Sequence, residues 1–248
     1  TQSKSSAASD VYKRQADPDR RLEHLSRASE ELRTLHLSME AQLIEWVGLF
    51  LPTARFETNR GSVAGRLSEV ASLTEFATAL EVDDAHEQPT PSEWKALHGW
   101  AVMVANQRRQ LDQLEHAIRV SAQAHLPSVS TLVGPLLAAR LCVEAHGRLR
   151  LARLPSGTVQ VLGAEKAFFN HLRNGSAPPK HGHIFMHPWI SRSPRWIRGK
   201  IARMLASKIS IAARIDAFGG TPMTQEDVDK VEAKVEAIRT EFSTPKRR

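Results

Sequence analysis

The chain has 248 residues, enough for one large domain or two small ones, and carries 34 Lys or Arg against 27 Asp or Glu. The net charge of +7 and the pI of about 9.9 favour a polyanionic partner, either a nucleic acid or an anionic membrane surface. No apolar run approaches 18 residues, so we expect no membrane span. The single cysteine, Cys142, excludes an internal disulfide and is expected to be a buried, inert thiol.

Residues 1–15 are polar and aperiodic, unlike the segments that follow. Their SDVYKRQ piece resembles translated adapter sequence found at the ends of assembled environmental reads. We therefore interpret 1–15 as a non-native or disordered segment and exclude it from the fold. On this interpretation the true N-terminus of the gene product is missing.

Residues 16–126 contain two stretches in which apolar residues recur every seven positions, which predicts two long antiparallel helices joined by a tip region. A shorter helix around residues 67–80 is expected in the tip. Ser29, His36 and Gln107 interrupt the apolar seams, so a coiled coil and ordinary bundle helices both remain open. In a coiled-coil hairpin the heptad positions become the candidate residues for pairing with a second copy: Leu25, Leu32, Met39, Trp46, Leu97, Val104, Leu111 and Ile118.

Residues 127–245 are compact, apolar and punctuated by Gly and Pro, which predicts the short packed helices of one domain, and 246–248 form a basic tail. A long helix is expected from about Arg195 to Phe218, where two glycines end it. Thr224 and Asp227 predict a capping box for a last amphipathic helix. Only GTVQVL and GHIFM are strand-like, and both are short. We therefore predict an all-α fold.

The positive charge is concentrated in one segment. Lys166 to Arg214 hold ten Lys or Arg and no acid, so residues 163–216, which add two acids, carry 10 − 2 = +8, and the rest of the chain carries −1. At 100° per residue one face of the long helix presents three cations and two hydroxyls, which suit phosphate oxygens. A solvated face normally mixes both signs, so we favour nucleic acid over that alternative. The stripe comprises Lys200, Arg203, Ser207, Ser210 and Arg214.

Four histidines lie within 17 residues: His171, His181, His183 and His187. No Cys or carboxylate accompanies them, so we predict no metal site. We find no nucleophile–base pair and no Gly-rich phosphate loop, so we predict no catalytic residues, no cofactor and no enzyme. The His, Phe and Trp side chains of this region instead suit stacking on unpaired bases, which is how RNA is usually recognised.

Two long motifs, VLGAEKAFFNHLRNGSAPPKHGHIFMHPWI and RGKIARMLASKISIAARIDAFGG, resemble the Nop domain. LVGPLLAARL and LARLPSGTVQVLGAEK fit the same pattern, so the resemblance covers about residues 92–245 well and the first arm more loosely. It is strongest to the archaeal scaffold of box C/D small ribonucleoproteins. Related proteins are the eukaryotic nucleolar scaffold pair and a spliceosomal pre-mRNA-processing factor.

The resemblance implies long antiparallel coiled-coil arms followed by a helical Nop domain, in a scaffold that performs no chemistry. It implies as partners a guide RNA with a kink-turn, a small kink-turn-binding protein already on that RNA, and a second scaffold copy. Fibrillarin, the S-adenosylmethionine-dependent 2′-O-methyltransferase, is recruited in the family by an N-terminal domain that we do not find in this sequence. The location implied is cytoplasmic in an archaeon and nucleolar or nuclear in a eukaryote, and no membrane is involved.

The same resemblance places Lys166 of GAEK and Lys180-His181 of PPKHG at the RNA, and Met186 where relatives carry a polar or ring-bearing contact residue. Two alternatives remain: a helical adaptor whose basic face meets an acidic protein, and a splicing-type Nop protein bound to a small nuclear RNA complex. The expected RNA-contacting residues are Lys166, Lys180, His181, Met186, Arg198, Lys200, Arg203, Lys208 and Arg214.

Overall fold

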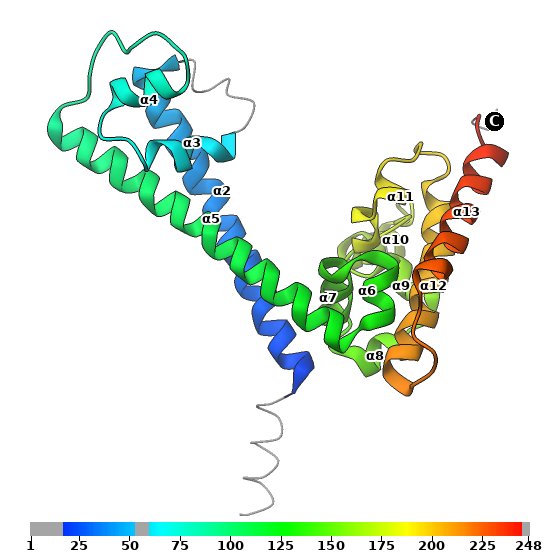
Figure 1. The fold of residues 1–248 in the computed structure, drawn as a ribbon. Helices are drawn as coiled ribbons and strands as arrows, with labels where there is room; N and C mark the ends of the chain where they lie inside the picture. The colour runs from blue at the N-terminus through cyan, green and yellow to red at the C-terminus, as the bar shows by residue number, and fades with distance from the viewer. Residues whose placement is uncertain (1–16, 53–59, 245–248) are drawn as a thin grey trace, which may run out of the picture. The chain divides into compact units, whose positions relative to one another are not determined.

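The computed structural model describes residues 17–52 and 60–244 (Figure 1). All regular elements within these ranges are helical, which confirms the all-α prediction. The segments 1–15 and 246–248 lie outside the described residues. The elements are α2 (Pro18–Phe50), α3 (Arg60–Leu67), α4 (Leu73–Ala79), α5 (Pro91–His125), α6 (Pro127–Val133), α7 (Pro135–Glu144), α8 (Arg148–Arg153), α9 (Ser156–Val161), α10 (Glu165–Asn174), the 3-10 helix η2 (His183–Met186), α11 (Pro188–Ser191), α12 (Arg198–Phe218) and α13 (Gln225–Glu241).

The chain forms two compact units. Residues 27–115 make up the first, which we call the arm unit. The second, the basic unit, combines residues 17–26 with residues from 116 onward. None of the helices in the described ranges is both long enough and apolar enough to span a lipid bilayer.

In the arm unit α2 and α5 run antiparallel, as their contacts show. The indole of Trp100 donates to the carbonyl of Met39 over 3.1 Å, and Arg33 pairs with Glu115 further along α5. The short helices α3 and α4 complete a core around Phe76. The start of α5 is fixed by a reciprocal cap, because Thr90 N–H donates to Glu93 (2.8 Å) and Glu93 N–H donates to Thr90 Oγ1 (3.3 Å).

The polar residues that interrupt the predicted seams lie inside the helix packing. Ser29 and His36 are each 5% exposed. The amide of Gln107 donates to Met39 Sδ, and its carbonyl oxygen has no partner among the described residues. Because such unpaired polar atoms cost free energy, the seams are not optimised for stability alone.

The predicted pairing residues of the second arm need correction. Leu97 and Val104 belong to one buried core of their own chain and Ile118 to another. These three residues and Leu111 are at most 4% exposed. They therefore offer no surface to a second copy. The first-arm positions Leu25, Leu32, Met39 and Trp46 are partly buried.

In the basic unit α12 packs against α6, α8 and α9, with α13 along another side. Its buried residues run from Ile201 to Ala213. Asp216, near its end, accepts hydrogen bonds from the backbone N–H groups of Ser128 (2.8 Å) and Val129 (3.0 Å). These N–H groups open α6 and have no partner within that helix, so the carboxylate joins α12 to the start of α6.

Two local sequence predictions can be compared with the structure. The capping box of Thr224 and Asp227 is present at the start of α13. The strand-like stretches GTVQVL and GHIFM form α9 and η2 instead of strands. They nevertheless lie side by side, joined by hydrogen bonds from Gly182 N–H to Gln160 O and from His183 N–H to Leu162 O, both 2.8 Å.

Candidate nucleic-acid interface

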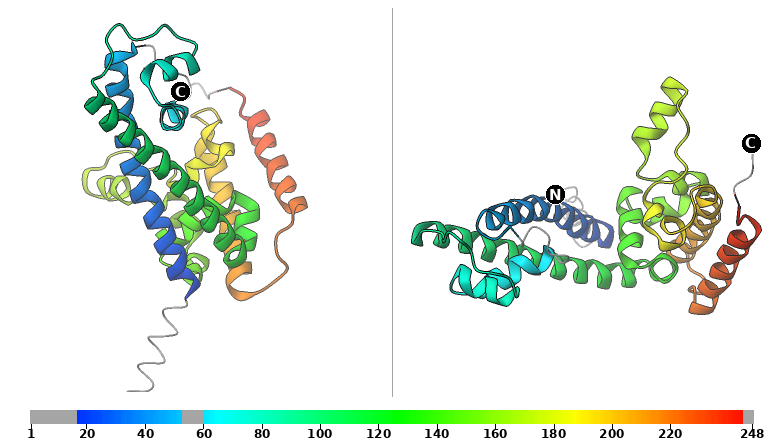
Figure 2. Two further views of the ribbon diagram at one scale, coloured as in Figure 1. Left: turned by 60° about the vertical axis from the view of Figure 1, so that its left-hand side comes forward. Right: turned by 90° about the horizontal axis from the view of Figure 1, so that it is seen from above.

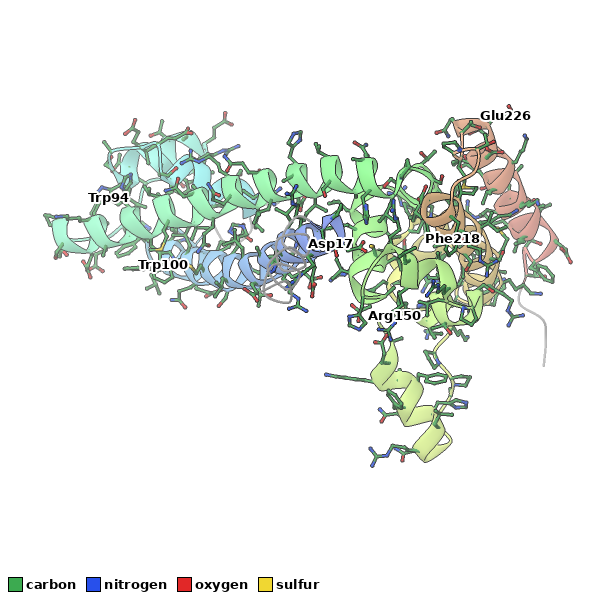
Figure 3. The ribbon with its side chains drawn as sticks, turned by 90° about the horizontal axis from the view of Figure 1, so that it is seen from below. Asp17, Trp94, Trp100, Arg150, Phe218 and Glu226 are labelled. Carbon is green, nitrogen blue, oxygen red and sulfur yellow. The ribbon has the colours of Figure 1, made fainter. Side chains whose placement is uncertain are left out.

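Helix α10 begins within the GAEK motif, at Glu165, and has no buried residue. Figures 2 and 3 show it extending away from the other helices of the basic unit. Its apolar side chains Phe168, Phe169 and Leu172 are exposed, the last by 63%, and Lys166 is exposed beside them. An amphipathic helix normally buries its apolar face, so α10 offers a surface for contact with another molecule.

The base of α10 is held by a close approach between Gly163 and His183. Gly163 has φ +83°, and a Cβ at this position would lie 2.1 Å from Nε2 of His183. His183 in turn contacts Glu144 of α7 over 3.4 Å, and Gly163 N–H donates to Glu165 over 2.7 Å. Glycine is therefore required at the first position of GAEK, and Glu165 is engaged locally.

The PPKHG loop returns from α10 to the body at Gly182. A Cβ on Gly182 would lie 2.0 Å from the carbonyl oxygen of Leu162, so the two backbones touch. Gln160 also donates from its side-chain amide to the carbonyl of Lys180 over 2.7 Å. These contacts fix the backbone of Lys180 and His181 and leave the ammonium group of Lys180 exposed.

His181 stacks on Phe185, with ring centroids 4.5 Å apart and planes 15° from parallel. The guanidinium of Arg198 lies 5.3 Å from the same Phe185 ring. Burial lowers the pKa of His181, and the charges of Arg198 and Lys180 lower it further. His181 is thus held as a neutral ring in a positive environment, a combination suited to base stacking beside phosphate.

The other predicted contact residues near this loop differ in availability. Arg198 donates to the carbonyls of Ser193 (2.8 Å) and Ser191 (3.0 Å), so it supports the turn before α12. Met186 is 57% exposed, and Arg140 of α7 donates to its sulfur over 3.2 Å. The sequence reasoning missed Arg140 because it lies 46 residues before Met186, and no local pattern signals the contact.

The predicted phosphate-binding stripe on α12 needs correction at its two hydroxyls. Ser210 is buried and donates to Ala206 O, and Ser207 donates to Met204 O, so these hydroxyls serve the helix backbone and not a phosphate. The ammonium group of Lys200 lies 3.8 Å from the centre of the Phe242 ring. The pKa of Asp227 is lowered mainly by its hydrogen bonds with Thr224, and the charge of Lys208 also lowers it. Both lysines therefore lie on the side of α12 that faces α13 and its following residues. Arg203 is exposed.

His187 begins α11. Its Nδ1 accepts a hydrogen bond from Trp189 N–H over 3.3 Å, and burial lowers its pKa to about 4. The ring is therefore a neutral helix cap. His171 contacts the carbonyl of Ser176 at the other end of α10. The structure thus gives His171, His181, His183 and His187 separate local partners.

A different group has the residue types of a metal site. In the described ranges Asp19, His125 and Cys142 bring three ligand atoms within 4.8 Å of one another. Asp19 Oδ1 accepts from His125 (2.6 Å), from Arg148 N–H (3.0 Å) and from Cys142 (3.4 Å). Burial raises the pKa of Asp19, but these hydrogen bonds outweigh it and leave the pKa below its usual value. Burial also raises the pKa of the Cys142 thiol, which is free and buried. Asp19, His125 and Cys142 thus form a hydrogen-bonded cluster, which we call the clamp.

Fold and site together define an all-helical module with a cation-rich loop cluster and an exposed amphipathic helix. A family profile described as "Nop: snoRNA binding domain, fibrillarin" matches residues 41–237, which is more than half of the chain. The chain therefore belongs to the Nop family.

Individual relatives agree with this membership. An uncharacterized NOP5 family protein of Methanocaldococcus jannaschii is 34% identical over 230 residues, which cover 86% of this chain and 55% of the relative. Nucleolar protein 56 of Homo sapiens is 42% identical over 118 residues, 48% of this chain and 20% of the relative. A chain in a crystal structure of a fibrillarin/Nop5p complex has the same fold, with a TM-score of 0.58, 24% identity and coverage of 92% of this chain and 72% of that chain. The chain thus spans about half the length of the archaeal relative, and less of the nucleolar one.

Proposed function

We propose that this chain is the RNA-binding part of a box C/D small ribonucleoprotein scaffold, which takes part in guide-directed 2′-O-methylation without catalysing it. The main support is a group of cationic and aromatic side chains within residues 163–186, which we call the loop cluster, in a chain that belongs to the Nop family. Lys166 and Lys180 present exposed ammonium groups there, and His181 presents a stacked ring. Cations position phosphates, and rings stack on unpaired bases.

The exposed face of α10 supports a composite partner. Phe168, Phe169 and Leu172 form an apolar surface beside Lys166. RNA alone would leave much of this apolar area without a matching surface. A small protein seated on a kink-turn supplies apolar side chains, and the RNA beside it supplies anionic phosphates. We accordingly propose a kink-turn RNA with its small binding protein as the ligand, and fibrillarin as a further partner of the scaffold. An archaeal member would act in the cytoplasm and a eukaryotic one in the nucleolus.

Self-association with a second copy is proposed through the outer face of α2. Leu35 and Leu49 are 58% and 70% exposed and lie two heptads apart, so they share one side of the helix. This surface replaces the buried second-arm positions as the candidate for pairing.

The proposal is tested by replacing Lys166 and Lys180 with Ala and measuring binding to a kink-turn RNA preloaded with its small protein. Both side chains are exposed, so we expect an unchanged melting temperature, weaker binding and a logarithmic salt slope smaller by about 1 to 2. Lys230→Ala/Lys234→Ala on α13 removes the same charge elsewhere and is the matched control. Equal binding by the two double variants would contradict the proposed site. Tight binding of an acidic protein with no RNA binding would favour the adaptor alternative.

A further inference from the structure

Two arginines hold the turn between α11 and α12, residues 192–197, from two sides. Arg198, the first residue of α12, donates to the carbonyls of Ser191 (3.0 Å) and Ser193 (2.8 Å). Arg239 of α13 donates from Nε and from Nη2 to the hydroxyl oxygen of Ser193, over 3.1 Å in each case. We call Arg198, Ser193 and Arg239 the arginine brace.

The contact between α13 and this turn has a fixed geometry. Ser193 is buried, and its hydroxyl donates to the carbonyl of Trp189 over 2.6 Å, which leaves its oxygen to accept from Arg239. Nη1 of Arg239 is in turn bound to Glu236 over 2.6 Å. A guanidinium offers several N–H groups in one plane, so it joins several acceptors at fixed angles, which a lysine cannot do.

The brace reaches the loop cluster through the ring of Phe185. The guanidinium carbon of Arg198 lies 5.3 Å from the centre of that ring, and the ring of His181 stacks on it with centroids 4.5 Å apart. One face of the His181 ring therefore lies on Phe185, so an unpaired base can stack only on the opposite face. Any residue that fixes Phe185 thus also sets the orientation of the face that a base would meet.

The contacts of Arg198 favour a positioning role over a phosphate contact. The edge formed by Nε and Nη2 could bind a phosphate through two parallel hydrogen bonds, but both nitrogens already donate to carbonyls of the turn. A cation in the first turn of a helix is also disfavoured by the helix dipole, so helix stability does not explain its place. Its contacts with the turn and with Phe185 do explain it.

We propose that Arg198 and Arg239 are positioning residues that hold the His181 ring in the orientation in which it stacks on an unpaired base of the RNA. This inference rests on the proposed function and deepens it, because it couples the docking of α13 to the loop cluster. A ring that is fixed before binding loses less conformational freedom when the base arrives, so the brace strengthens binding without touching the RNA. It adds no phosphate contact and leaves the salt slope unchanged.

The test compares Arg198→Lys with wild type on two kink-turn RNAs, both preloaded with the small protein. The RNAs differ only in whether the unpaired nucleotides that the small protein leaves exposed carry bases or are abasic. Lysine keeps the charge but cannot join two carbonyls while covering a ring, so we expect the base-bearing RNA to bind about five-fold more weakly, with the same salt slope. On the abasic RNA the variant should match wild type. Arg239→Met, which removes the contact from the side of α13, should show the same pattern.

Matched controls come from the same turn and the same helix. Arg195→Lys and Lys234→Met change exposed residues and should bind both RNAs like their parent chain, apart from an equal charge effect on the two. In the free chain, the Phe185 ring current should shift the ring-proton resonances of His181, and Arg198→Lys should reduce that shift. A purely structural role of the brace would lower the melting temperature without this base-dependent loss.

The outcomes separate this inference from the proposed function. Unchanged affinity of either brace variant for the base-bearing RNA, or an equal loss on both RNAs, would overturn the brace. If Arg198→Lys does not fold, Arg239→Met carries the same comparison. Failure of wild type to prefer a kink-turn over a plain duplex would instead contradict the proposed function.

Discussion

Replacing Gly163 by Ala should disturb the base of α10 in two separable ways. A residue other than glycine at φ +83° costs about 1–2 kcal/mol. In addition, the new Cβ would overlap His183, with 2.1, 2.2 and 2.6 Å to three ring atoms, and would displace its contact with Glu144. We expect a total loss of about 3 kcal/mol in the free energy of unfolding, or about 6–12 °C in melting temperature for a chain of this size.

The assay is a double-mutant cycle with His183→Ala, measured by denaturant unfolding. Removing the ring should relieve the overlap and leave the backbone strain, so the double variant should recover at least about 1 kcal/mol relative to the sum of the single losses. RNA binding by Gly163→Ala should weaken as well, because Lys166 is placed by the same turn. Strict additivity of the two substitutions would refute the reasoning, since it would mean that the ring and the glycine do not compete for space.

Three further predictions concern the clamp, the helix cap and self-association. The neutral cap His187 has a pKa of about 4 in the folded state against 6.5 in the unfolded chain, so the unfolded state binds more protons between these values and stability falls as pH drops through that window. The difference corresponds to about 3 kcal/mol, reduced to about 2 by partial exposure, and His187→Asn, which keeps a cap acceptor without titrating, should remove this pH dependence in unfolding curves at pH 4–7. Asp19→Asn should lower the free energy of unfolding by about 2 kcal/mol at pH 7, because three donors lose a charged acceptor. The folded pKa of Asp19 is depressed, so its contribution to stability is present above the unfolded pKa and is lost as pH falls through the folded pKa. A wild-type advantage that does not shrink as pH falls below the unfolded pKa would contradict this. Leu35→Lys/Leu49→Lys should convert self-associated chain to monomer in sedimentation at tens of micromolar, roughly where such assays are run, whereas an unchanged mass would exclude this face of α2.

Features encoded by neighbouring residues could be predicted from the sequence. The capping box at Thr224 depends on a partner three residues away, and the structure contains it. The long helix was expected from about Arg195 and begins at Arg198, because residues 194–197 form the turn that Arg198 supports through Ser191 and Ser193. The helical class followed from apolar periodicity along the arms.

Features that depend on tertiary packing could not be predicted in this way. Ser210 lies at the edge of the polar stripe on a helical wheel, but the packing of α12 within the basic unit buries it. A wheel gives angles around one axis and does not say where the neighbouring helices lie. Arg140 beside Met186, and Asp19 beside His125 and Cys142, join residues far apart in sequence, so no local spacing signals them.

The stretches GTVQVL and GHIFM show why local preference can be overridden. Each carries β-branched or aromatic residues that favour strands, yet each forms one helical turn or two in the structure. Their backbones still meet through two hydrogen bonds, at the point where Gly182 approaches Leu162. The pairing is too short for a sheet, and the packing of α9 on α12 favours the helical state.

We propose that this chain recognises a kink-turn RNA together with its small binding protein. The most direct measurement is the ratio of two dissociation constants at one fixed salt concentration. One is for the preloaded kink-turn RNA, and the other is for a plain duplex of equal length and charge. We predict a preference of at least about ten-fold for the preloaded kink-turn, equivalent to about 1.4 kcal/mol. Equal affinity for both would contradict the claim and reduce the basic unit to a nonspecific polyanion-binding surface.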